Sequence, residues 1–272
     1  MSGTVSALSI VCMSISGLVG FAIPVVLCLY FKLKKRADLV PFFIGCAVFF
    51  LFALVLESIV HQLVLVVSPV GKTIQGNIWL YALYGGAMAG LFEETGRFIA
   101  FKTVLRRWSG KDVNALMYGA GHGGFEALMT LGSSMISDIV MAVMINTGTT
   151  SLLLASLSGD ALAQGEAVLY SLASTSPYLF LIGIAERIFA VGLHISLSVF
   201  VWFAAKNAKR WYLFPLAIFL HFFVDASLVV LSGLGLPTLA IEGILCVLTA
   251  AVVLLAKKVW NDNTAESAVP EA

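Results

Sequence analysis

Apolar runs of about 20 residues recur along the whole chain, and this recurrence limits the folds open to it. A helix of about that length crosses the hydrocarbon core of a bilayer. The chain of 272 residues is 60% hydrophobic and only 11% charged, with a mean hydropathy of +1.00. This composition excludes an ordinary water-soluble domain and predicts an all-α, polytopic transmembrane bundle.

We expect about seven spans, each long enough to cross the membrane. Residues 1–260 form a single predicted transmembrane domain, and residues 261–272 a disordered cytoplasmic tail. The segment 147–176 is expected outside the membrane, as an interfacial or re-entrant helix or as an ordinary loop, and the sequence leaves both open. The predicted spans are 5–31, 39–67, 78–101, 113–135 with an extension to 146 that glycines loosen or kink, 177–205, 211–231 and 238–256.

The distribution of Lys and Arg predicts how the bundle is oriented. The loops after the first, third and fifth spans and the tail after the seventh are rich in these residues, whereas the opposite loops contain only Lys72. Basic loops stay on the cytoplasmic side. We therefore expect the N-terminus outside and the C-terminus in the cytoplasm of a multi-pass cell-membrane protein.

Several predicted spans contain ionisable side chains that a lipid-facing helix does not tolerate. A charge at the centre of a span costs roughly 2.5–3.5 kcal/mol on insertion scales. Such groups persist where they face one another or water, so we expect them to form one site within spans at about 78–232. The residues are Glu93, Glu94, Arg97, His122, Glu126, His194, His221 and Asp225.

Depth and helical spacing support a single site. Counted inward from the cytoplasmic end of each span, these residues overlap at roughly 11–21 Å, in the cytoplasmic half of the bundle, where we expect the site to open. His122/Glu126 and His221/Asp225 are both i,i+4 pairs, which present two polar groups on one face. A second, outer layer contains Glu57, His61, Glu186 and Arg187, and we expect a structural ion pair between Arg187 and Glu57.

The residue types are those of general acid and base chemistry or of metal binding. Glu93 and Glu94 point about 100° apart on a helix, so one is expected to activate water and the other to hold Arg97. His194 and His221 are candidates to bind a metal or to stabilise an oxyanion, and Asp225 to orient His221. With His122 and Glu126 they form a candidate Zn²⁺ set, although no HExxH motif supports it.

The order of these motifs resembles a known family. FEETGRF contains EExxR, GHGGFEALM supplies His122 and Glu126, FAVGLH supplies His194, and HFFVD supplies HxxxD. This pattern, over roughly half of the chain, resembles the YhfC family of intramembrane proteases, in the group with PrsW and the type II CAAX prenyl proteases. The chain departs from the CAAX pattern of EExxxR and HxxxN, and from PrsW, which has Lys in the first motif. The resemblance implies peptide-bond hydrolysis with a first-motif glutamate activating water.

The sequence therefore predicts a membrane-embedded peptidase, of glutamic or metallo type, that acts on membrane-associated proteins or peptides. No nucleic-acid partner is indicated, and neither the substrate nor the oligomeric state follows from the residues. The alternative is a proton-coupled transporter or ion channel that uses the same carboxylates and histidines. A third hypothesis is a non-catalytic immunity or signalling protein that keeps the cluster as a binding site.

Overall fold

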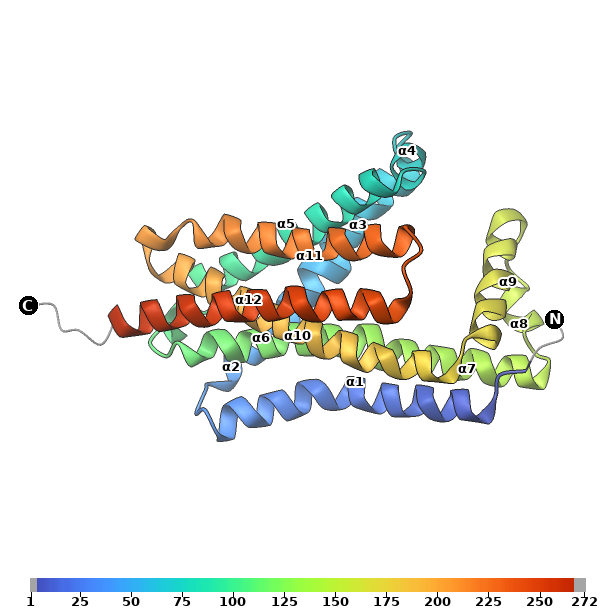
Figure 1. Ribbon diagram of the computed structural model, residues 1–272, viewed down its shortest axis with the longest axis horizontal. Helices are drawn as coiled ribbons and strands as arrows, with labels where there is room; N and C mark the ends of the chain where they lie inside the picture. Colours follow the sequence, from blue (N-terminus) through green and yellow to red (C-terminus); the bar gives the residue numbers. More distant parts are fainter. Residues whose placement is uncertain (1–3, 267–272) are drawn as a thin grey trace, which may run out of the picture. The chain divides into compact units, whose positions relative to one another are not determined.

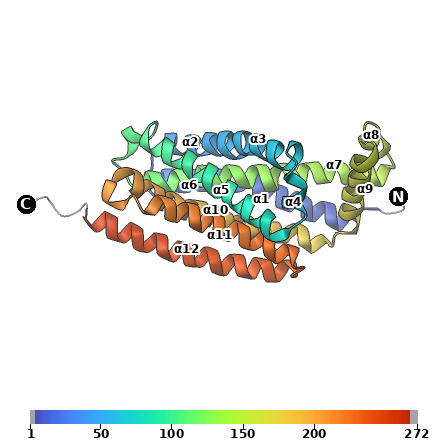
Figure 2. The same ribbon diagram turned by 90° about the horizontal axis from the view of Figure 1, so that it is seen from above.

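The computed structural model describes residues 4–266, and every regular element in that range is a helix (Figures 1 and 2). The predicted all-α class is therefore confirmed. The elements are α1 (Ala7–Leu33), α2 (Leu39–Phe49), η1 (Phe50–Glu57), α3 (Ser58–His61), η2 (Gln62–Val67), α4 (Gly71–Gln75), α5 (Ile78–Lys102), η3 (Arg106–Trp108), α6 (Val113–Ala127), η4 (Leu128–Ser133), α7 (Ser134–Thr147), α8 (Ser151–Leu154), α9 (Gly159–Ser174), α10 (Pro177–Lys206), η5 (Ala208–Arg210), α11 (Leu213–Gly233) and α12 (Thr238–Glu266).

The chain is a multi-pass integral membrane protein, for which the cell membrane is the expected location. Within the described range, six helical stretches are long and apolar enough to cross a bilayer. With its 25 residues α5 is also long enough, but its buried Glu93, Glu94 and Arg97 lower its hydropathy. About seven spans therefore remain consistent with the structure. The orientation of the termini stays a prediction from the basic loops.

Two helical spans contain π-helical stretches. The second span continues from α2 through η1, α3 and η2, and the fourth continues from α6 through η4 and α7 to Thr147. The extension of the fourth span is thus present. The glycines at 119–124, expected to loosen or kink this helix, lie in regular α6, and the wider turns begin only at Leu128. These glycines serve close packing instead.

The structure also bears on two further predictions, for the segment 147–176 and for the C-terminal tail. The segment 147–176 contains α8 and α9, so its helical alternative holds over much of its length, and α9 packs on α7. At the C-terminus α12 continues to Glu266, which corrects the expected start of a disordered tail at 261. Asn263 accepts a hydrogen bond from Arg210 Nε at 3.0 Å and donates to the Val259 carbonyl. Residues 267–272 lie outside the described range.

The predicted single domain divides into two compact units. One contains residues 127–187 with the N-terminal part of α1 up to residue 23, and Ser16 there donates to the Phe180 carbonyl at 2.7 Å. The other, which we call the site unit, contains residues 24–126 and the chain from 188 onward. Within the site unit α5 packs antiparallel along α11, and α12 lies beside α11 (Figures 1 and 2).

Close helix contacts in the site unit require glycine. A Cβ on Gly45 of α2 would lie 2.3 Å from the Tyr118 carbonyl oxygen and 2.8 Å from the His122 nitrogen, both on α6. A Cβ on Gly121 of α6 would lie 2.0 Å from the Phe42 carbonyl oxygen on α2. Because the obstacles are backbone atoms, they cannot rotate away. These contacts fix the distance of His122 from the second span.

Replacing Gly45 with alanine should therefore destabilise the protein. Separating α2 from α6 should cost about 1–3 kcal/mol, the usual range for overpacking a core. Gly85→Ala is the matched control, since a Cβ on Gly85 of α5 would meet nothing within 4 Å. The free energy of unfolding in detergent micelles measures the difference, and equal stability of the two variants would contradict the close-packing argument.

Candidate functional site

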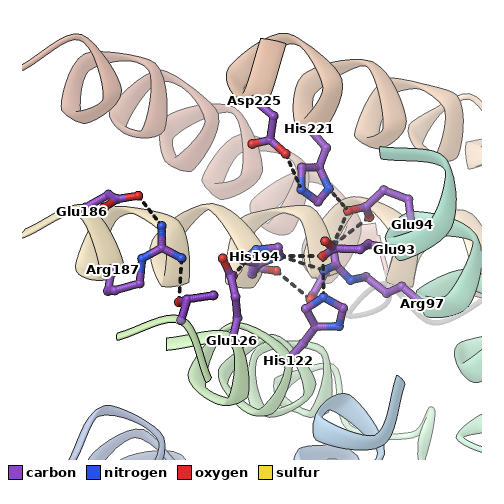
Figure 3. A network of polar contacts seen from close by, with 12 residues as sticks. Glu93, Glu94, Arg97, His122, Glu126, Glu186, Arg187, His194, His221 and Asp225 are labelled. Carbon is purple, nitrogen blue, oxygen red and sulfur yellow. Dashed lines mark hydrogen bonds and ion pairs between the residues drawn. The ribbon is translucent and has the colours of Figure 1, made fainter. Parts of the chain in front are cut away.

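The site unit brings together the predicted site residues from four helices (Figure 3). Hydrogen bonds or ion pairs link them into one network, so the expectation of convergence is met. The contributing residues are Glu93, Glu94 and Arg97 of α5, His122 and Glu126 of α6, His194 of α10, and His221 and Asp225 of α11.

Glu94 and Arg97 form a fully buried ion pair. Arg97 Nη1 donates to both oxygens of Glu94 at 2.8 and 2.7 Å, and both side chains are 0% exposed. The i,i+3 spacing on α5 brings the two groups together. Glu94 Oε1 also lies 2.9 Å from His221 Nδ1, which ties α5 to α11. Of the two adjacent glutamates, Glu94 is therefore the one that holds Arg97.

Glu93 is the carboxylate left without a direct arginine contact. Its Oε2 lies 2.8 Å from His122 Nε2 and 3.7 Å from His194 Nδ1. His122 Nδ1 is buried and has no hydrogen-bond partner among the described residues. If the His122 ring carries its proton on Nε2, this N–H donates a hydrogen bond to Glu93, and only the acceptor Nδ1 stays unpaired. This tautomer costs less free energy than one that leaves a buried N–H donor unpaired. His122 therefore positions Glu93.

Both nitrogens of His194 have polar neighbours. Arg97 Nη2 lies 3.2 Å from His194 Nδ1, and since a guanidinium only donates, Nδ1 accepts. In the neutral ring the proton is then on Nε2, which lies 2.6 Å from Glu126 Oε2. Glu126 is thus a partner of His194, and His194 connects α10 to both α5 and α6.

His221 is held between two carboxylates. Its Nδ1 faces Glu94, and its Nε2 lies 3.4 Å from Asp225 Oδ2, one turn further along α11. The rings of His194 and His221 are 5.2 Å apart between centroids. A histidine whose Nδ1 is fixed by a carboxylate presents Nε2 in a defined direction, an arrangement common around metal-binding imidazoles.

A buried group compatible with a metal ion lies at the centre of this network. Glu93, His194 and His221 each offer one ligand atom, and these atoms lie within 4.8 Å of one another. Two imidazoles and a carboxylate form a known donor set for catalytic zinc. The chemistry of this group is therefore compatible with a divalent metal ion.

The compact group differs in part from the metal-binding set that the sequence suggested. The sequence suggested His122 and Glu126 beside His194 and His221, but the compact group contains only the last two, with Glu93. The physical reason is that His122 Nε2 faces the Glu93 carboxylate and Glu126 faces His194.

The site is closed at the end of the bundle where α5 ends. Below Arg97, Phe101 packs edge-on against Tyr118 and Trp202, with centroids 4.6 and 5.1 Å apart. These aromatic side chains are almost completely buried, as is Leu105. This packing disfavours an opening directly past Phe101, while the side from which the site opens stays a prediction.

The exposed fraction of the site's side chains increases with distance from the end of the bundle where α5 ends. Arg97 and His122 side chains are 0% exposed, whereas the exposed fraction rises to 15% for Glu126 and 34% for Asp225. Glu126 and Asp225 each lie one turn further from the closed end than the histidine on the same helix. The most exposed side chains of this network therefore lie on the Asp225 side.

The residues of the predicted outer layer form local polar contacts within each of the two units. His61 Nε2 lies 3.1 Å from Glu57 Oε1, and His61 Nδ1 lies 3.0 Å from the Tyr84 hydroxyl on α5. Arg187 donates to Glu186 and to Thr130. The ion pair expected between Arg187 and Glu57 stays a prediction.

Two tyrosines of these networks were not among the predicted site residues. Tyr84 binds His61, and the fully buried Tyr118 lies 6.0 Å from the Arg97 guanidinium, measured from its ring centroid. Tyr118 precedes His122 by four residues, so helical spacing could have placed it on the same face. Nothing in the local sequence singles out Tyr84, because its partner lies on another helix.

Comparison with known proteins shows what the chain is similar to. The model of the YhfC intramembrane metalloprotease family matches residues 19–245. A membrane protein of Bacillus subtilis (strain 168), described as uncharacterized membrane protein YhfC, is 39% identical over 221 residues, which cover 80% of this chain and 83% of the relative. No solved structure gives a significant match.

Proposed function

Since the chain belongs to the YhfC intramembrane metalloprotease family, we propose that it hydrolyses peptide bonds of membrane-associated proteins or peptides, with Glu93 activating the water. The observation that best supports this is the buried group of Glu93, His194 and His221, in a network where Glu94 already neutralises Arg97. A carboxylate and two imidazoles at one point can take up a proton and stabilise a developing negative charge.

Glu93 acts as the general base in this proposal. A water beside its carboxylate gives up a proton as its oxygen attacks the scissile carbonyl, and Glu93 later passes that proton to the leaving amine. The hydrogen bond from His122 Nε2, at 2.8 Å, keeps the carboxylate oriented toward the other two members of the group. Positioned proton transfer of this kind typically contributes about 10²–10⁴-fold to the rate.

Glu94, Arg97 and Asp225 have positioning roles. Arg97 holds the Glu94 carboxylate in a fully buried ion pair, and Glu94 fixes His221 through Nδ1. Asp225, at the opposite nitrogen, limits rotation of the same ring. His221 is then held beside His194 and Glu93, where it would bind the proposed ion without further reorganisation of its ring.

Zn²⁺ is the proposed ion, and His194 and His221 would hold it beside Glu93. Bound there, it would polarise the scissile carbonyl as a Lewis acid. The substrate would reach the site from the Asp225 side, because the aromatic side chains around Phe101 close the other end.

Metal analysis combined with a cleavage assay tests this function. Purified protein should contain about one divalent ion per chain, and His221→Ala should lower metal affinity by at least about tenfold. In liposomes the wild type should cleave membrane-anchored peptides, and a chelator should stop cleavage until Zn²⁺ is restored. A wild type that moves protons or cations and cuts no peptide offered would instead support a transporter.

A further inference from the structure

A polar hollow lies at the closed end of the site unit, away from the catalytic network. Its volume is about 470 Å³, and it lies between the ends of α5 and α10 and the loop that follows α5. Its wall carries three cations and a hydroxyl, over a floor of aromatic side chains. The lining residues used here are Lys102, Arg106, Lys206, Ser109, Phe101 and Trp202.

The positive charge of this hollow is only partly compensated. Lys206 Nζ lies 2.5 Å from Asp112 Oδ1, which also accepts from Trp202 Nε1 at 2.8 Å. Neither Lys102 nor Arg106 forms an ion pair within residues 4–266. Two cations with unused donors therefore face a space large enough for an anionic group, and an arginine is well suited to bind phosphate oxygens.

We propose that this hollow binds the phosphate of an anionic phospholipid headgroup. Lys102 and Lys206 are the last residues of α5 and α10, which places them where a span meets the headgroup region. Basic pockets between helices at this level bind anionic lipids. The neighbouring Val104 is 52% exposed, and together with Thr103 it lines an adjoining hollow that shares Arg106. A lipid has the apolar part that this surface can contact, and free phosphate does not.

Binding of short-chain phosphatidylglycerol to the delipidated full chain, in a neutral detergent, tests the proposal. Titration calorimetry should give tighter binding of phosphatidylglycerol than of phosphatidylcholine or inorganic phosphate. Arg106→Gln, and the pair Lys102→Gln with Arg106→Gln, should weaken it by about fivefold or more for each charge removed. Lys209→Gln is the matched control, because Lys209 is an exposed cation of the same end that does not line the hollow. It should change the affinity by less than about twofold.

The outcomes separate the possible ligands. Equal weakening by Lys209→Gln would mean that diffuse charge, and no defined pocket, attracts the lipid, which would overturn the proposal. Inorganic phosphate that displaces the lipid at equal concentration would identify a soluble phosphate ligand and overturn the lipid assignment. The unfolding midpoint without lipid should be the same for all variants, and the single variant Arg106→Gln keeps the test valid if the double variant does not fold. None of these outcomes depends on peptidase activity.

Discussion

Glu93→Gln should lower peptide turnover by about 10²–10⁴-fold while the protein stays folded in the membrane. Glutamine has nearly the same shape and can still accept a hydrogen bond from His122 Nε2, now 2.8 Å from the Glu93 carboxylate. It cannot take a proton from water. The rate of cleavage of a membrane-anchored peptide in liposomes measures the loss, and unaltered turnover would refute the role of Glu93.

Glu57→Gln provides the matched control for this experiment. Glu57 and Glu93 are both 7% exposed and both have a histidine partner, so the two substitutions remove equally buried carboxylates. Glu57 pairs with His61 outside the catalytic network, and its loss should affect turnover only mildly. An equal loss of turnover in both variants would indicate that removing any buried carboxylate lowers activity, whatever its position, and would contradict a specific role for Glu93.

Metal content distinguishes two roles for Glu93. A general base can be removed without removing the ion, since His194 and His221 still hold it, so Glu93→Gln should retain metal where His221→Ala loses it. Loss of both metal and turnover in Glu93→Gln would make this residue a ligand. The proton acceptor would then be another carboxylate of the network.

Much of the fold can be predicted from the sequence because the lipid bilayer offers no hydrogen-bond partners to the backbone. A spanning segment must satisfy its own backbone hydrogen bonds, so apolar length alone predicts helices. The π-helical stretches could not be predicted this way. The packing of the glycines near His122 could not be predicted either, because Gly121 faces Phe42 of α2 whereas Gly119 and Gly123 face α10.

The composition of the site was also predictable, but its internal pairing was not. An unpaired charge in lipid costs free energy, so ionisable side chains at the same depth in several spans are expected to face one another. Which carboxylate faces which histidine depends on helix rotation, and a difference of about 100° separates Glu93 from Glu94. For the same reason the sequence could not show that His122 faces Glu93. The packing of Phe101 against Tyr118 and Trp202 was not predictable either, because this contact joins distant parts of the chain.

Arg97→Met should destabilise the folded protein by about 3–5 kcal/mol, the cost of leaving one partner of a buried ion pair alone. Methionine fills much of the arginine volume but leaves the Glu94 carboxylate, which is 0% exposed, with His221 as its remaining neighbour. The free energy of unfolding in detergent micelles measures the effect. Because Arg97 also donates to His194, the variant should lose turnover together with stability.

Combining Arg97→Met with Glu94→Gln shows whether the unpaired charge is the cause. Glutamine removes the buried negative charge and can still bond to His221, so the double variant should regain most of the lost stability. It should not regain turnover, since the group that fixes His221 is no longer a carboxylate. A double variant as unstable as Arg97→Met would show that arginine packing against Tyr118, 6.0 Å away, matters more than its charge.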